Sequence, residues 1–535
     1  MSTTKREVIN FCKEFYKLKG RFPTFKDLDE NGITREVVRQ RFNTKSNLEK
    51  VATDEMSLQY LEAPKDKTVS KLKKNQKRYI IIGIQNNTYL DQELIKCLTQ
   101  YAEYNKAEIL ALPMYYRNPT SITESNKIEK EYWWDDNFPG KYVTKNMNLG
   151  PYLKLMPEHR INITSINPLG GLEHLAGKYS AIYANSHLQM KVVPESQDKV
   201  PHIMHTTGTA CKTDNYSKTN AGGKAKRFAT KGALIIELSG DIFNLRQLEF
   251  KDGVICDLDK VYTPVRVMDI AEYGASAMVW GDIHAEVADT VVVRASKELA
   301  DLCNVETHYL HDVLDFSCQS HHNKYNFIMR YMLSKHGKDK VSLAIKDTAK
   351  FIVDLTDRAD VKIVDSNHHD HIKRWINECN FKDMGADNAY FYICLIKKVM
   401  ETVQLDEDKL TLSNDNVMRL AIDIVNGDKP LGNEVEFLSR NESHTFKDVE
   451  LSQHGDIGPN GSRGSITGMA KTNSAMVIGH SHTPGINKHV FQVGKTAHIA
   501  QSYTKGYTSH LNTHCIIYPN GARALINIIG GNYKI

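Results

Sequence analysis

The sequence has no long hydrophobic run and no paired cysteines, and both absences exclude whole classes of protein. No stretch of about 18 consecutive apolar residues occurs, so we expect no membrane-spanning helix. The first residues, MSTTKREVINF, lack the apolar centre of a secretory signal, so we expect no leader. The nine cysteines are scattered, which favours reduced thiols in a cytoplasmic compartment over a disulfide framework. No internal repeat or low-complexity tract is visible.

The composition is that of a globular protein with an unevenly distributed charge. Hydrophobic residues make up 41% and charged residues 25% of the 535 residues, a length that predicts two to four domains. Residues 1–78 contain 19 Lys and Arg against 11 Asp and Glu, whereas the rest contains 50 against 53. A basic arm on a nearly neutral body favours a polyanion such as nucleic acid as partner. The alternative is a basic segment that is merely solvated.

The basic arm has the pattern of a small DNA-binding motif. A helix is predicted over residues 5–18, followed by a short helix ending at Leu28, a turn at Asn31-Gly32 and a helix capped by Thr34. This layout, with PTFKDLDENGI before RQRF, resembles the helix-turn-helix repeats found beside phage and homing-endonuclease proteins. The alternative is a helical oligomerisation element. The resemblance implies DNA contacts by the arginines of the last helix, Arg35, Arg39 and Arg41.

Four regions are expected along the chain. Residues 1–62 form the helix-turn-helix region, and the polar, basic residues 63–78 form a linker. A strand–helix–strand pattern opens an α/β region over 79–271, whose role the sequence leaves open. Over 272–535, apolar strands are each followed by polar residues. The expected fold class is therefore mixed α/β.

The polar residues after these strands have the types and spacing of metal ligands. Asp282 and His284 lie two apart after an apolar strand, and His480 and His482 repeat that spacing, so each pair faces one side of an extended chain. Histidine is the commonest transition-metal ligand, and 17 of the 22 histidines lie between His284 and His514. Between the two pairs come further polar residues: Asp312, Asp315, Asn367, His368 and His454.

Taken in order, GDIH, HDVLD, SNHHD, the lone His454 and GHSH resemble the motifs of calcineurin-like metallophosphoesterases. The family pattern is D-x-H, G-D-x-x-D, G-N-H-D/E, H and G-H-x-H. The resemblance implies a β-sandwich flanked by helices and two divalent ions bridged by Asp312. One ion would be held by Asp282, His284, Asp312 and His482, and the other by Asp312, Asn367, His454 and His480. Mn²⁺ is favoured, as in the nucleases of the family, and Mg²⁺, Fe²⁺, Co²⁺ or Zn²⁺ is compatible.

The resemblance also assigns residues that bind no metal. His368 would protonate the leaving oxygen, with Asp315 as its partner. Arg463, in the glycine-bearing loop after His454, is a candidate contact to the substrate backbone. The other histidines near the motifs are expected to be surface or core residues: His321, His322, His371, His444 and His498.

Three positions depart from the family pattern. His311 and Ser366 replace glycines, which changes the backbone freedom expected at two turns. His369 stands where the family has an acidic residue, and Asp370 follows at once.

The candidate metal ligands and the basic N-terminal arm together predict a metal-dependent DNase. The whole layout is similar to the pre-early DNases of large tailed phages, which break down host DNA. That similarity implies action in the host bacterial cytoplasm and a homo-oligomer. Two alternatives stay open: a phosphomonoesterase, acting on protein or nucleotide, whose N-terminal region assembles subunits, and a non-enzymatic DNA-binding regulator.

Overall fold

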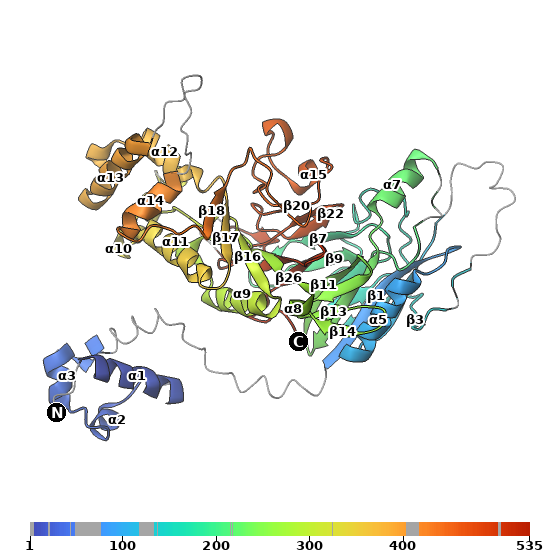
Figure 1. The fold of residues 1–535 in the computed structure, drawn as a ribbon, viewed down its shortest axis with the longest axis horizontal. Helices are drawn as coiled ribbons and strands as arrows, with labels where there is room; N and C mark the ends of the chain where they lie inside the picture. Colours follow the sequence, from blue (N-terminus) through green and yellow to red (C-terminus); the bar gives the residue numbers. More distant parts are fainter. Residues whose placement is uncertain are drawn as a thin grey trace. The chain divides into compact units, whose positions relative to one another are not determined.

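The protein divides into two compact units, Met1–Asn75 and Gln76–Ile535 (Figure 1). The computed structural model describes residues 5–19, 22–42, 44–45, 47–48, 76–116, 133–135, 137–213, 216, 218–323, 325–402, 417–500 and 504–535. No helix among these residues is long and apolar enough to span a bilayer. The nine cysteines are free thiols.

In the described part of the N-terminal unit, capping residues explain where two helices begin. Thr24 Oγ1 accepts a hydrogen bond from Asp27 N at 3.3 Å while Asp27 Oδ2 accepts one from Thr24 N at 2.6 Å, which forms a capping box. Thr34 Oγ1 accepts a hydrogen bond from Val37 N at 3.4 Å. Gly32 between them adopts a left-handed φ of 75°. The helices are α1 (Lys5–Lys19), α2 (Phe25–Asp29) and α3 (Arg35–Phe42).

A small apolar core joins these helices and leaves the basic side of α3 exposed. Arg35, Arg39 and Arg41 are exposed, and the Arg35 guanidinium lies 4.8 Å from the centre of the Phe25 ring. The expected helices and turn are confirmed, and their use in binding DNA stays a prediction. The core side chains are Val8, Ile9, Cys12, Leu28, Ile33, Val38, Phe42 and Leu48.

The larger unit begins with an eight-stranded sheet. Its β1 pairs in parallel with β2 through the helix α5 (Gln92–Asn105), which confirms the expected strand–helix–strand unit. The predicted linker ends earlier than expected, because residues 76–78 already pair with β10 and Arg78 Nε lies 3.2 Å from Glu237 Oε1. Residues 63–75 lie outside the described residues. The strand order is β14 (Val267–Asp269), β13 (Lys260–Tyr262), β12 (Val254–Asp257), β11 (Ile242–Lys251), β10 (Gly232–Ser239), β1 (Gln76–Gln85), β2 (Glu108–Met114) and β3 (Lys141–Tyr142).

A six-stranded sheet carries helices on one face. Four of its strands are parallel, and a closing hairpin of β25 and β26 adds two antiparallel ones. The order is β18 (Val435–Leu438), β17 (Asp360–Val364), β16 (Val305–Leu310), β15 (Ser276–Val279), β25 (Thr513–Ile517) and β26 (Arg523–Asn527). The helices that share its apolar cluster are α9 (Thr290–Leu302), α11 (Val341–Thr356), α12 (Asp370–Glu378), α13 (Ala386–Thr402) and α14 (Val417–Asn426).

A ten-stranded sheet combines strands from both halves of the larger unit. Its β22 pairs with β7, placing Ile486 opposite Met190. The boundary expected between 79–271 and 272–535 therefore does not separate two compact units, because one hydrogen-bonded sheet runs across it. The order is β19 (Thr445–Phe446), β20 (Val449–Glu450), β21 (Met476–Ile478), β23 (Val490–Gln492), β22 (Gly485–Asn487), β7 (Gln189–Val193), β9 (His202–Thr206), β6 (Ser180–Tyr183), β5 (Leu153–Leu155) and β4 (Met147–Gly150).

Short elements complete the larger unit. They are β8 (Glu195–Ser196) paired with β24 (Tyr507–Thr508), the helices α7 (Asn220–Phe228), α8 (Ile270–Tyr273), α10 (Phe327–Lys335) and α15 (Ile466–Met469), and the 3₁₀ turns η2 (Ala285–Val287), η3 (His321–Asn323), η4 (Phe381–Asp383) and η5 (Pro459–Gly461).

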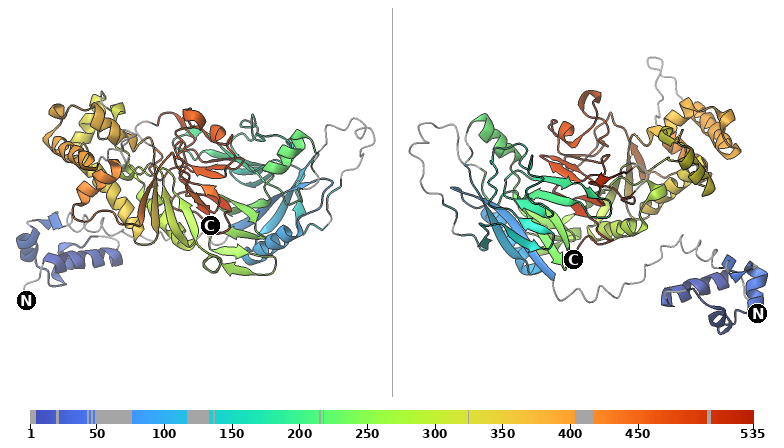
Figure 2. Two further views of the ribbon diagram at one scale, coloured as in Figure 1. Left: turned by 45° about the horizontal axis from the view of Figure 1, so that its top comes forward. Right: turned by 180° about the vertical axis from the view of Figure 1, so that it is seen from behind.

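One apolar core lies between the three large sheets. Val279 and Ile517 of the six-stranded sheet, Val477 and Phe491 of the ten-stranded sheet and Leu234 of the eight-stranded sheet belong to the same buried cluster. Burying each such side chain contributes about 1.5–3 kcal/mol. Figure 2 shows the sheets of the larger unit side by side, with the yellow and orange helices of the six-stranded sheet at one end. The expected mixed α/β class, with a β-sandwich flanked by helices, is confirmed.

Candidate metal centre

The predicted ligands meet because their strands end at the same edge. β15, β16 and β17 are parallel, so the residues that follow them, among them Asp282, Asp312 and Asn367, emerge at their carboxyl ends. In the facing sheet β20 and β21 are also parallel, and His454 and His482 follow them. The structure thus brings together the five motifs recognised in the sequence.

The first proposed ligand set is compact and buried. Asp282, His284, Asp312 and His482 are buried, and one donor atom of each lies within 4.8 Å of the others. His482 Nε2 lies 3.3 Å from Asp282 Oδ2 and 3.1 Å from His284 Nε2. Such close nitrogen and oxygen donors are what a transition-metal ion requires.

The second set surrounds the other side of the shared aspartate. His454 Nε2 lies 3.2 Å from Asp312 Oδ2. The His454 and His480 ring centres are 5.3 Å apart, and His480 Nδ1 lies 3.1 Å from Asn367 Oδ1. Asp312 therefore stands between the two sets, where a bridging carboxylate belongs.

The backbone is strained at this edge. His284, Asp312, His480 and His482 adopt left-handed φ angles of 47°, 42°, 74° and 57°. Such conformations cost roughly 1–3 kcal/mol each and persist where the surroundings impose them. A hydrogen bond from His284 N to Asp312 O at 2.8 Å ties two of these turns together. Four of the seven proposed ligands therefore have a strained backbone.

Glycines make room for the ligands. A Cβ atom on Gly479 would lie 2.4 Å from Asp282 Oδ1, so the glycine of GHSH is required by a close approach. A Cβ on Gly281 would lie 2.7 Å from the carbonyl oxygen of Thr513. Gly479, which matches the family pattern, and Gly281 thus each have a steric reason to be glycine.

The two replaced glycines need no such freedom here. His311 and Ser366 are not among the described residues with positive φ. His311 is buried, and its Nδ1 lies 3.1 Å from His454 Nδ1. Burial, together with the charge of His454, holds the pKa of His311 well below its usual range. His311 therefore lies beside a candidate ligand, a placement that the sequence pattern presented only as a departure.

The third departure from the family pattern is His369, which stands where the family has an acidic residue. His369 is buried, and burial lowers its pKa to about 3. Asp370 does not take the missing acidic place, because its Oδ2 lies 3.0 Å from Arg440 Nη2. Arg440 also contacts Asp365 at 3.2 Å and Asp456 at 3.3 Å. These charged residues line a cavity of about 670 Å³ beside His454.

Burial and neighbouring charges perturb the protonation of the centre. Burial, reinforced by Asp312, raises the pKa of Asp282 to about 7. Burial acts against ionisation of Asp312 too, but His454 and other histidines hold the pKa of Asp312 well below its usual range. Asp312 in turn raises the pKa of the buried His454 to about 9. The site therefore stabilises the negative charge of Asp312.

Asp315 is expected to hold His368, and one donor atom each of His284, Asp315 and His368 lies within 4.8 Å of the others, but the direct contact of the carboxylate is to His284. Its carboxylate Oδ1 lies 3.2 Å from His284 Nδ1. His368 Nδ1 instead lies 3.0 Å from the main-chain carbonyl oxygen of Asp315. The carboxylate thus orients a candidate metal ligand, while the backbone of the same residue orients His368.

Comparison with known proteins places the chain in a family. No family model matches the chain. Protein A1 of Escherichia phage T5 is 31% identical over 482 residues, which cover 86% of this chain and 83% of that protein. The chain belongs to the protein A1 family.

The solved structures that resemble this chain match only part of it and have low TM-scores. A single mutant of Vps29 from Entamoeba histolytica matches 36% of this chain and 98% of its own length, with 11% identity and a TM-score of 0.19. Vps29 from Chaetomium thermophilum matches 35% and 99%, with 8% identity and a TM-score of 0.20. The fold of this A1-family chain therefore rests on its own strand order and pairing.

Two further residues of the A1-family chain support the centre and were not predicted. Glu286 accepts hydrogen bonds from Asp315 N at 2.8 Å and Phe316 N at 2.9 Å, which holds the second motif in place. Lys495, whose backbone forms a bridge with that of Asp282, is fully buried, and burial lowers its pKa to about 8. Glu286 stands two residues after His284, a spacing that could have drawn attention to it, whereas nothing near Lys495 in the sequence marks it.

The predicted DNA contacts lie in two places. Arg35, Arg39 and Arg41 belong to α3 of the N-terminal unit. Arg463 is exposed in the loop after His454, where its backbone forms a bridge with Ile457. The structure keeps both as exposed basic positions and does not test whether they bind DNA.

Proposed function

We propose that this A1-family chain is a metal-dependent DNase that hydrolyses phosphodiester bonds at a dinuclear centre. The observation that carries the proposal is the position of Asp312, which belongs to a buried group with Asp282, His284 and His482 while its Oδ2 lies 3.2 Å from His454 Nε2. Two divalent ions held by these residues would bind a phosphate and would lower the pKa of an attacking water.

The residues present fit such ions. Asp312 Oδ1 is buried and accepts no hydrogen bond from any described residue. A buried charge without compensation is costly, and a cation would supply the missing partner. Two ions bring four positive charges against two aspartates, Asp282 and Asp312, which leaves about +2 for a phosphate and a hydroxide. We propose Mn²⁺, with the mixed nitrogen and oxygen donors also accepting Fe²⁺, Co²⁺, Zn²⁺ or Mg²⁺.

His368 is the proposed general acid. Its ring centre lies 4.6 Å from that of His284, at the rim of the ligand set, and it is half-buried. With Nδ1–H donating to the Asp315 carbonyl, Nε2 is the atom that holds the transferable proton. When the bond between phosphorus and the leaving oxygen breaks, Nε2 gives its proton to that oxygen.

DNA is the proposed substrate because of the N-terminal unit. The exposed arginines of α3 and the surplus of basic residues over 1–78 favour contact with phosphates. Because the relative is a phage protein, we propose that the DNA broken down is that of the bacterial host, in the host cytoplasm. A homo-oligomer is part of the same proposal.

The test uses full-length protein on linear and covalently closed circular DNA with Mn²⁺, followed by EDTA. We expect cleavage that needs Mn²⁺ and stops with EDTA. Asp312→Asn should abolish it, whereas Asp354→Asn, which alters a carboxylate paired with Lys297, should not. Turnover of p-nitrophenyl phosphate without turnover of its bis-ester or of DNA would favour a phosphomonoesterase instead. Binding to DNA without any hydrolysis would favour a regulator.

A further inference from the structure

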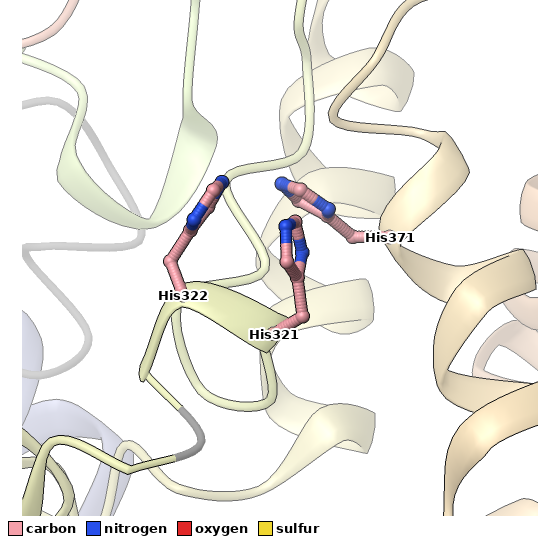
Figure 3. A group of neighbouring side chains, drawn as sticks. All are labelled: His321, His322 and His371. Atoms are coloured by element: carbon pink, nitrogen blue, oxygen red, sulfur yellow. The ribbon is translucent and has the colours of Figure 1, made fainter.

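Three histidines outside the dinuclear centre point toward one another. His321 and His322 are neighbours on η3, and His371 lies in the first turn of α12 (Figure 3). One ring nitrogen of each lies within 4.8 Å of the others. Their ring centres are 3.8 Å, 5.1 Å and 6.0 Å apart. Two segments far apart in the chain thus place three imidazole rings next to one another.

We propose that His321, His322 and His371 bind a third divalent ion of the zinc class. Zinc–nitrogen bonds of about 2.0–2.1 Å in a tetrahedral site separate the nitrogens by about 3.4 Å. The observed nitrogens are close enough that a small turn of His322, whose side chain is exposed, completes the set. The sequence pattern placed all three among ordinary histidines, and this proposal replaces that expectation.

The protonation of the cluster favours a cation. Burial, reinforced by His368 and His321, lowers the pKa of His371 to about 3, and burial with His322 lowers the pKa of His321. At neutral pH both rings are uncharged and offer a lone pair. Neutral imidazoles bind Zn²⁺, Co²⁺ or Ni²⁺ and have little affinity for phosphate or for Mg²⁺.

Two arginines, Arg330 and Arg374, line the cavity beside the cluster, and Arg374 directly opposes such an ion. Its Nη1 lies 3.0 Å from His321 Nδ1 and 2.8 Å from Nε2. Glu378, one turn further along α12, lies 3.7 Å from Arg374 Nε and offers the guanidinium another partner. Binding of the ion therefore requires Arg374 to turn from His321 toward Glu378, which weakens the site without abolishing it.

The surroundings leave a coordination position open. A cavity of about 260 Å³ is lined by His321, His371, Arg374 and Glu378. Three protein ligands with an open fourth position admit water. The ring of His371 lies 4.9 Å from that of His368, so the ion would tie η3 to the start of α12 beside the proposed general acid.

The experiment measures metal content and visible spectra rather than activity. Full-length protein, stripped with chelator, is titrated with Co²⁺ and compared with His322→Ala and with the control His498→Ala. His498 is a histidine elsewhere that lies 3.0 Å from Asp289. We expect His322→Ala to lose one equivalent of Co²⁺ and its absorption band, with affinity at that site falling by about 100-fold or more, since loss of an outer partner alone costs 10–100-fold. His498→Ala should match the unsubstituted protein.

Two further variants separate this site from the dinuclear centre. In an Asp312→Asn background, His322→Ala should still remove one equivalent of Co²⁺, whether or not the proposed DNase centre still binds metal. Arg374→Gln removes the opposing charge and should tighten Co²⁺ binding about tenfold or more. Equal Co²⁺ content and identical spectra in the unsubstituted protein and His322→Ala would overturn the proposal. Weaker binding in Arg374→Gln would also count against it.

Discussion

Replacing Asp315 with asparagine tests whether its carboxylate orients His284 or His368. The carboxylate lies 3.2 Å from His284 Nδ1, and that contact fixes a proton on Nδ1 and leaves Nε2 for a metal ion. Burial acts against the charge of Asp315, but the hydrogen bond from His284 outweighs it, so the pKa of Asp315 is lowered. Asparagine keeps the shape and an acceptor oxygen but carries no charge. His284 therefore becomes a weaker and less well-oriented ligand.

The size of the effect follows from the contact. Loss of a charged partner behind a metal-binding histidine costs 10–100-fold in metal affinity, or about 1.4–2.7 kcal/mol. The contact from His368 Nδ1 to the carbonyl oxygen of residue 315 is unaffected, because the substitution leaves the main chain in place. Proton donation by His368 should therefore survive, and the maximal rate at saturating metal should change by only a few-fold.

The assay is the initial rate of DNA cleavage as a function of Mn²⁺ concentration. In Asp315→Asn the Mn²⁺ concentration for half-maximal rate should rise about 10–100-fold while the maximal rate is nearly kept. Asp354→Asn serves as the matched control, because it removes a carboxylate paired with Lys297 away from the centre. An unchanged Mn²⁺ dependence with a maximal rate lowered by about 10²–10⁴-fold would refute the reasoning and return Asp315 to His368.

Other substitutions test the remaining roles. His368→Ala should keep the metal content but lower cleavage by about 10²–10⁴-fold, and loss of an ion on metal analysis would make His368 a ligand instead. Gly479→Ala should lower metal content and activity together, because its Cβ would lie 2.4 Å from Asp282 Oδ1; a fully active variant would show that this turn relaxes freely. Deleting residues 1–75 should flatten the slope of log affinity against log salt, measured by binding titrations, by about 0.9 for each phosphate that the deleted unit neutralises. An unchanged slope would leave the N-terminal unit without a role in DNA binding.

Local features could be read from the sequence because neighbouring residues determine them. The capping box of Thr24 and Asp27 and the turn at Gly32 set the helices of the N-terminal unit within a few residues. Asp282 and His284 could be proposed as ligands from their residue types and spacing, although the strand ends at Val279 and His284 adopts a left-handed φ, so strand alternation is not what places them. The order of the motifs then identified the partners of these two residues.

Only the tertiary structure decided the contacts between distant segments. Nothing in the local pattern of β7 and β22 states that they pair, because strands choose partners by long-range packing. The direction of the Asp315 carboxylate depends on where the turn after β16 meets His284, and no spacing encodes it. His322 and His371 have ordinary surroundings in sequence, and they meet because η3 and α12 pack together. Residue types and their order therefore predicted the candidate metal ligands. Packing decided which of these side chains contact one another.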